Sequence, residues 1–265
     1  MVFAHRGGAA LRPENTMLAF DHGLSLGADG LEFDVHLSRD GVVVVHHDAT
    51  LERTTNGSGP LAARTADELA RLDAGYRFSP PSPAQTAPAP ARQPAVYPFR
   101  GLAGGVPRLD EVLRRYPEAH CIIELKVNDP ELAHRTIDAV RAAGAVERVA
   151  LGSFGTRVLR AARAREPRIP TGASREETRL ALYRSWVRWP VRRPDYREFQ
   201  VPEVAGSTRV VSPRFVRDAH QAGVVVRVWT VNDEADMRRL LEWGVDALIS
   251  DRPDLAVEVA RRPAR

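Results

Sequence analysis

The sequence lacks several features that would place the protein in a familiar class. It has one cysteine, Cys121, which rules out an internal disulfide framework and favours a reducing compartment, so we expect a cytoplasmic location. No stretch approaches the roughly 18 apolar residues of a membrane-spanning helix. Residues 1–5 show neither the charged region nor the apolar stretch of a signal peptide. We therefore expect no stable membrane insertion.

The sequence also has little net charge. Its 38 Lys and Arg residues exceed its 34 Asp and Glu residues by only four. So small an excess fits an anionic small-molecule substrate as well as a nucleic acid, and no basic stripe interleaved with aromatic residues favours nucleic acid. We expect a small-molecule partner and no nucleic acid, while the oligomeric state is left open by these patterns.

Apolar strand-like segments alternate with helical patterns along the whole chain. The expected strands are 2–4, a run that begins at Leu31, 121–125, 149–151, 169–172, 198–201, 224–229 and 247–250. Eight such alternations predict an α/β fold, a (β/α)8 TIM barrel that forms a single domain over residues 1–265. A doubly wound open sheet would alternate similarly, but no Gly-x-Gly-x-x-Gly follows the first strand to indicate a dinucleotide site.

One long interruption follows the second strand. Residues 51–105 are predicted to be an inserted loop or small subdomain, and they contain a proline-rich stretch, 79–98, with seven prolines in twenty residues. Such a composition cannot build a core of its own. Because strand and helix patterns resume afterwards, we interpret the segment as an insertion after strand 2 and not as a domain boundary.

The most informative stretch is 31–48, which contains two strand-like runs around an Asp-Gly turn. Strand side chains alternate between faces, so Glu32 and Asp34 share one side. Two adjacent carboxylates repel each other unless a cation lies between them, which indicates a hard divalent metal. The second run delivers His47 directly after an apolar segment, a placement that suits acid-base chemistry.

Other charged residues fall where barrel strands are expected to end, which is where such barrels place their active sites. His5 and Arg6 follow the first strand, and Glu124 and Lys126 end the third. A carboxylate that interrupts an apolar strand needs a partner. The structural alternative for Glu124 is an ion pair with Lys126; the functional one, which we favour because of its place at a strand end, is a third metal ligand.

These charge types narrow the reaction. A metal together with Arg6 and Lys126 can neutralise a phosphate, while His5 and His47 can remove and donate protons at the entering and leaving oxygens. Phosphodiester cleavage requires both functions. TIM-barrel enzymes that abstract a proton next to a carbonyl also bind a metal through carboxylates, but their reaction does not require two histidines together with an arginine. Trp229 at the end of the seventh strand is either a core residue or the wall of a substrate pocket.

Several further polar residues receive no leading role. Asn232 is expected to be the N-cap of the next helix. His36 shares the carboxylate face but lies further along its strand, so it is at best a support, and His46 alternates away from His47. Arg227 is expected to lie on the same face of its strand as Trp229, and the sequence suggests no function for it.

A set of motifs, taken in order, resembles the glycerophosphodiester phosphodiesterase family. The resemblance covers residues 4–253 and rests on the segments 5–7, 13–16, 31–35, 46–55, 123–126 and 228–232. It implies a (β/α)8 barrel that hydrolyses glycerophosphodiesters to glycerol 3-phosphate and an alcohol. The enzyme would be a phosphoric diester hydrolase of glycerol and lipid metabolism.

The same resemblance implies roles for individual residues. Glu32, Asp34 and Glu124 would bind one divalent cation, Ca or Mg, and His5 and His47 would be the acid-base pair. Arg6 and Lys126 would contact the phosphate. Glu14 and Asn15 would lie beside His5 as supporting residues. The sequence does not choose between attack by a neighbouring hydroxyl and direct attack by water. Two other hypotheses stay open: a lysophospholipase D type cleavage of lysolipids, and a catalytically inactive ligand-binding barrel.

Overall fold

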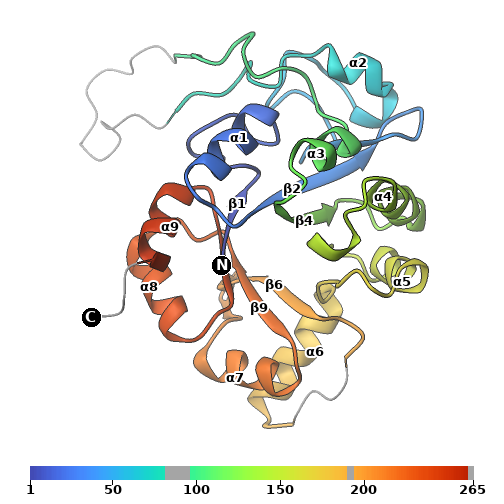
Figure 1. Cartoon of the computed structure of the whole chain (residues 1–265). Helices are drawn as coiled ribbons and strands as arrows, with labels where there is room; N and C mark the ends of the chain where they lie inside the picture. The colour runs from blue at the N-terminus through green and yellow to red at the C-terminus, as the bar shows by residue number, and fades with distance from the viewer. Residues whose placement is uncertain (81–95, 190–193, 262–265) are drawn as a thin grey trace.

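The computed structural model describes residues 1–80, 96–189 and 194–261, and its strands are surrounded by helices (Figure 1). Seven parallel strands of the described residues lie side by side in the order β5-β4-β2-β1-β10-β9-β6. They are β1 (Val2–His5), β2 (Gly30–Leu37), β4 (His120–Leu125), β5 (Val149–Gly152), β6 (Glu198–Pro202), β9 (Val225–Trp229) and β10 (Ala247–Ser250). Neighbours in space are thus neighbours in chain order, as in a (β/α)8 barrel.

The strand expected at 169–172 is wrong in detail. Thr171 makes one isolated parallel bridge to β5, and Gly172 makes one to β6. Pro170 has no backbone N–H to donate to a ladder, and Ile169 uses its N–H to close a turn instead. The two bridges still lie between β5 and β6, so the barrel is nearly closed and the predicted α/β TIM-barrel fold is confirmed.

Helices follow the strands and cover the outside of the barrel (Figure 1). They are α1 (Met17–Ser25), α2 (Ala66–Ala70), α3 (Leu109–Arg115), α4 (Pro130–Ala142), α5 (Thr156–Arg165), α6 (Arg175–Trp186), α7 (Pro213–Gln221), α8 (Glu234–Glu242) and α9 (Pro253–Arg261). Shorter elements are η1 (Leu61–Ala63), η3 (Val146–Arg148), β7 (Val204–Ala205) and β8 (Thr208–Arg209). None of the helices within the described ranges is long and apolar enough to cross a membrane.

The stretch 31–48 folds as its pattern predicts. β3 (Val43–Val45) pairs antiparallel with the end of β2, and the turn between them closes with a hydrogen bond from the Ser38 backbone N–H to the Val42 carbonyl and one from the Val42 N–H to the Ser38 hydroxyl. The segment 51–105 then carries η1 and α2 before the chain returns to α3. Most of the proline-rich stretch, residues 81–95, lies outside the described residues.

Two apolar layers position the site. Because strand side chains alternate, Val2 and Ala4 pack against the helices while Phe3 faces the barrel interior. The interior cluster comprises Phe3, Ile122, Ala247 and Ile249. These side chains form an apolar floor, and the polar residues that follow them in β1 and β4 come together above it, at the carboxyl ends of the strands.

Candidate active site

Three carboxylates meet at the mouth of the barrel. Glu32 and Asp34 project from β2, and Glu124 lies directly opposite Asp34 on the neighbouring strand β4. One oxygen of each residue lies within 4.8 Å of one oxygen of the other two. Glu32 and Asp34 are buried, and Glu124 is partly exposed. The structure therefore brings together the three predicted metal ligands.

The electrostatics of this cluster fit a bound cation. Burial, reinforced by Asp34 and Glu124, raises the pKa of Glu32 to about 8. Burial and Asp34 likewise raise the pKa of Glu124. For Asp34 burial acts in the same direction, but Arg6 and Lys126 outweigh it and hold its pKa below the ordinary value. A donor set of carboxylate oxygens suits hard divalent cations such as Ca or Mg.

His5 is held by a carboxylate that the sequence pattern did not single out. Its Nδ1 donates a hydrogen bond to Oδ1 of Asp251 over 2.6 Å, and its Nε2 lies 3.8 Å from Oε2 of Glu32. Asn232 donates to Asp251 and accepts the Asp251 backbone N–H in return. The expectation that Asn232 caps the next helix is wrong, because Asp233 is the N-cap of α8.

His47 has a second, separate carboxylate partner. Its Nδ1 donates to Oδ1 of Asp48 over 2.6 Å. Arg53 holds the other Asp48 oxygen at 2.5 Å and contacts both oxygens of Glu14 at 2.7 Å. His36 contributes from further away, since its Nε2 donates to the backbone carbonyl of His47. Both imidazoles are thus oriented through Nδ1, which leaves Nε2 for the reacting groups.

The two predicted phosphate contacts lie at the edge of the cluster. Arg6 places Nε 3.2 Å from Asp34 and donates from Nη1 to Glu14. Lys126 lies 3.2 Å from Glu124 and 3.3 Å from Asp34. The ion pair considered as the structural alternative for Glu124 therefore exists alongside the carboxylate cluster.

The loop after β1 is shaped by unusual backbone conformations. Arg6 and Asn15 adopt left-handed φ angles of 50° and 56°, and Gly7 has φ 87°. A Cβ on Gly7 would lie 2.7 Å from Cβ of Ala19, so only glycine fits against α1. Asn15 uses this geometry to donate a hydrogen bond to Oδ2 of Asp34 over 2.9 Å. Asn15 thus contacts Asp34, while its neighbour Glu14 links Arg6 to Arg53.

Trp229 is half-buried at the end of β9, where its ring packs on the apolar floor. Its outer edge meets Phe154, with ring centroids 6.0 Å apart in an edge-to-face arrangement. Phe154, which sequence reasoning missed, adds an exposed aromatic surface beside the mouth. Arg227 lies deeper in the barrel, on the same face of β9 as Trp229. Its guanidinium forms an ion pair with Glu198 over 2.6 Å, which gives this inward-facing charge a partner.

The supporting carboxylates were missed for different reasons. Asp48 directly follows His47, so adjacency alone could have indicated it. Asp251 directly follows the last strand, β10, and its position at a strand end was the available signal. His46, whose side chain alternates away from His47, is buried with its ring hydrogen-bonded to the Thr50 carbonyl, and Cys121 is buried in the core.

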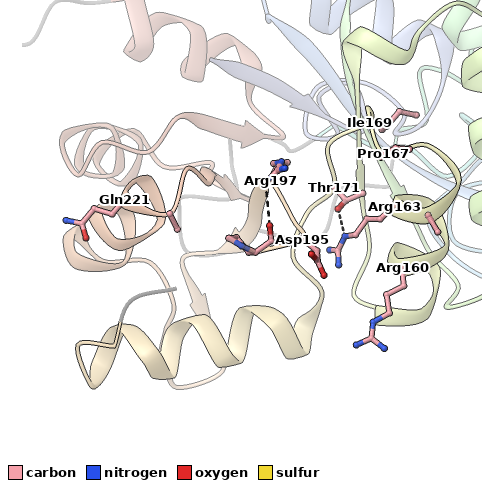
Figure 2. Close-up of a pocket in the computed structure, with 11 residues that line it drawn as sticks. Arg160, Arg163, Pro167, Ile169, Thr171, Asp195, Arg197 and Gln221 are labelled. Atoms are coloured by element: carbon pink, nitrogen blue, oxygen red, sulfur yellow. Dashed lines mark hydrogen bonds between the residues drawn. The ribbon is translucent and has the colours of Figure 1, made fainter. Parts of the chain in front are cut away.

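A separate hollow of about 970 Å³ lies at the opposite end of the barrel, next to the amino ends of β6 and β9 (Figure 2). Figure 2 shows Arg160, Arg163 and Arg197 around it. Arg163 is already engaged there, because it pairs with Glu177 and donates to Thr171. None of the residues that line this hollow belongs to the carboxylate and histidine cluster.

A nearly closed parallel barrel with this polar cluster at the carboxyl ends of its strands has the arrangement of a TIM-barrel enzyme. The model of the glycerophosphoryl diester phosphodiesterase family matches residues 5–255. A glycerophosphodiester phosphodiesterase from Caldanaerobacter subterraneus is 30% identical over 99% of this chain and 98% of its own length. One from Bacillus subtilis is 29% identical over 98% of this chain and 86% of its own.

Solved structures show the same relation. The glycerophosphodiester phosphodiesterase from Agrobacterium tumefaciens is 29% identical with a TM-score of 0.74, covering 97% of this chain and 98% of its own. A glycerophosphoryl diester phosphodiesterase domain from Mycobacterium tuberculosis is 26% identical with a TM-score of 0.82, covering 99% of both chains. The chain belongs to the glycerophosphoryl diester phosphodiesterase family and is an enzyme of that family.

Proposed function

We propose that the protein hydrolyses glycerophosphodiesters to glycerol 3-phosphate and an alcohol, with one divalent cation and with His5 and His47 as the acid-base pair. The observation that carries this proposal is that each imidazole has its own carboxylate partner and that the two flank the three acids. His5 lies beside Glu32, and His47 acts electrostatically on Asp34. A barrel from Oleispira antarctica, 24% identical, was solved with the product sn-glycerol-3-phosphate, which supports this product class.

In the proposal, Glu32, Asp34 and Glu124 hold the cation, either Ca or Mg. Their oxygen-only donor set and the raised pKa values of Glu32 and Glu124 support the assignment. When bound, the cation would neutralise charge on the phosphate oxygens and make the phosphorus a better electrophile. Arg6 and Lys126, at the edge of the cluster, would bind the same phosphate, and Trp229 would contact the substrate.

The proton transfers fall to the two histidines. One imidazole accepts a proton at Nε2 from the attacking oxygen, which belongs either to water or to the neighbouring hydroxyl of the glycerol. The new P–O bond forms as the P–O bond to the alcohol breaks, and the other imidazole donates its proton to the departing oxygen. If the glycerol hydroxyl attacks, the product is a cyclic phosphate that a water molecule then opens.

The organisation of the chain is part of the proposal. We place residues 1–265 in one domain, with 51–105 as an insertion that starts beside His47 and so borders the substrate. We further propose a cytoplasmic enzyme that acts on small molecules and not on nucleic acid, on the basis of its single buried cysteine and small net charge.

The test is an incubation with glycerophosphocholine and, in parallel, with lysophosphatidylcholine, each with and without a chelator. Metal-dependent release of glycerol 3-phosphate and choline from glycerophosphocholine supports the proposal. Release from lysophosphatidylcholine alone would favour the lysophospholipase D hypothesis, and no metal-dependent release from either substrate refutes the hydrolytic assignment. His5→Asn should lose turnover, whereas His120→Asn, on an exposed histidine at the other end of β4, should keep it.

A further inference from the structure

A row of exposed apolar side chains runs along the outer face of α6 and the turn that follows it. It consists of Leu180, Tyr183, Trp186, Val187 and Trp189, here called the α6 stripe. The chain has four tryptophans, and two of them are in this stripe with exposed fractions of 59% and 69%. The inner face of the helix is normally packed, since Ala181, Leu182 and Ser185 are buried. The side chains of the α6 stripe therefore do not contribute to the packing of α6 on the barrel.

The acids of α6, Glu176 and Glu177, lie in its first turn, and beyond them the charges along the stripe have one sign. Residues 178–189 contain three arginines, Arg179, Arg184 and Arg188, and no acidic residue. None of the three forms an ion pair within the described parts of the chain, although Arg163 in the adjacent helix α5 is paired with Glu177. Arginine and aromatic residues do interleave here, contrary to the expectation from the sequence that no such stripe exists.

We propose that the α6 stripe and its three arginines form a docking surface for an anionic lipid bilayer. Tryptophan and tyrosine favour the boundary between headgroups and acyl chains because their rings are apolar and their N–H and O–H groups are polar. Leu180 and Val187 can enter the apolar side of that boundary. Guanidinium groups that form no ion pair with the described residues can meet lipid phosphates.

The chemistry of the stripe separates a bilayer from two other occupants. A nucleic acid is usually followed by a basic groove with stacking rings, whereas this stripe lies on the convex outside of a helix and includes two aliphatic side chains. A second copy of the chain, related by a two-fold axis through the stripe, would bring arginines against arginines with no acid in 178–189 to pair them. The single sign of charge is instead complementary to an anionic membrane surface.

The fold sets the orientation of the docked protein. Helices of this barrel run back toward the amino ends of the strands, so the C-terminal half of α6 points away from the cluster at the carboxyl ends. α6 also lies across the barrel from α1, α2 and α3 (Figure 1). A protein bound through the α6 stripe would keep the mouth of the barrel open to water, so its activity on dissolved glycerophosphocholine should not change.

The experiment is sedimentation of the full chain with vesicles of phosphatidylcholine alone or with phosphatidylglycerol added. Binding should require the anionic lipid and weaken with salt. The triple variant R179Q/R184Q/R188Q should reduce partitioning by about 100-fold, from roughly fivefold for each arginine near the surface. The matched control is Arg157→Gln, an exposed arginine of α5.

A second pair of variants tests the apolar contribution. W186S/W189S should lose most of the binding, while Leu102→Ser, at an equally exposed apolar residue elsewhere, should bind as the wild type does. Turnover of glycerophosphocholine in solution serves as the check that all variants are folded. Equal binding to both vesicle types, wild-type binding by the stripe variants, a stripe-dependent dimer in light scattering, or tighter binding to single-stranded RNA would each overturn the proposal.

Discussion

Asp251→Asn is the substitution that most directly tests how His5 is oriented. In the structure, Oδ1 of Asp251 accepts from His5 and Oδ2 accepts from the side-chain amide of Asn232. The Asn232 amide cannot rotate without loss, because its oxygen accepts from Ser250 and from the Asp251 backbone. An asparagine at 251 must therefore turn its amide nitrogen toward either His5 or Asn232.

Both orientations are unfavourable. If the new amide nitrogen faces Asn232, two donors oppose each other and one hydrogen bond is lost; because Asn232 is exposed, this costs less than the about 1–3 kcal/mol of an unsatisfied buried group. If it faces His5, Nδ1 must become the acceptor, and the proton moves to Nε2, where the reacting group needs a base. Loss of correctly placed acid-base function lowers turnover by about 100- to 10,000-fold, so we expect kcat to fall within that range while the fold is retained.

The assay is kcat on glycerophosphocholine at saturating metal, together with urea unfolding of wild type and variant. Asp254→Asn is the control, since Asp254 forms an ion pair with Arg252 at the start of α9 and none with the histidines among the described residues. A kcat within about threefold of wild type for Asp251→Asn would refute the idea that this hydrogen bond sets the proton position on His5.

Three other outcomes are expected. Metal at about 100 times its Kd should stabilise the wild type against unfolding by about 2.7 kcal/mol, which raises Tm by about 5–10 °C. Glu124→Gln should show no such rise in Tm, whereas the control Glu131→Gln should show the same rise as the wild type. A rise in Tm retained by Glu124→Gln would remove Glu124 from the ligand set. The pKa of Glu32 is raised from 4.5 to about 8, so the folded state binds the proton more tightly, and in chelator stability should fall as pH rises through this window, less so in Glu32→Gln. Urea unfolding at each pH measures this, and a profile that rises over the same window contradicts it. Burial raises the pKa of Cys121 to about 11, so a thiol reagent should label it only after unfolding, and fast labelling of the native protein would be contrary evidence.

Local patterns predicted which of these side chains come together. Glu32 and Asp34 share a face because strand side chains alternate, and parallel pairing of β2 with β4 puts Glu124 opposite Asp34. His5 lies beside Glu32 for the same reason, since β1 pairs with β2 in register. These contacts follow from the alternation of side chains along each strand and from the regular pairing of neighbouring parallel strands, and both can be inferred from the sequence.

Contacts that depend on loops were not predictable in the same way. The bond between His5 and Asp251 joins residues 246 positions apart and requires the barrel to close β10 against β1. Arg53 reaches Glu14 across 39 residues through a turn with no periodic signal. The expected fifth strand failed because Pro170 interrupts its hydrogen bonding, which an apolar pattern does not register.

A chain of ion pairs runs from Asp48 through Arg53 and Glu14 to Arg6. It limits how much of the insertion can be replaced by the corresponding segment of a related enzyme. A donor loop that replaced Arg53 would release the partner of His47 and one of the contacts of Arg6 at the same time. Thr55 is fully buried, and its hydroxyl donates to the Leu51 carbonyl, so the turn around Arg53 is fixed at the start of the insertion. Loop grafting aimed at new headgroup preferences should therefore begin after Thr55, where sequence can vary without disturbing either histidine.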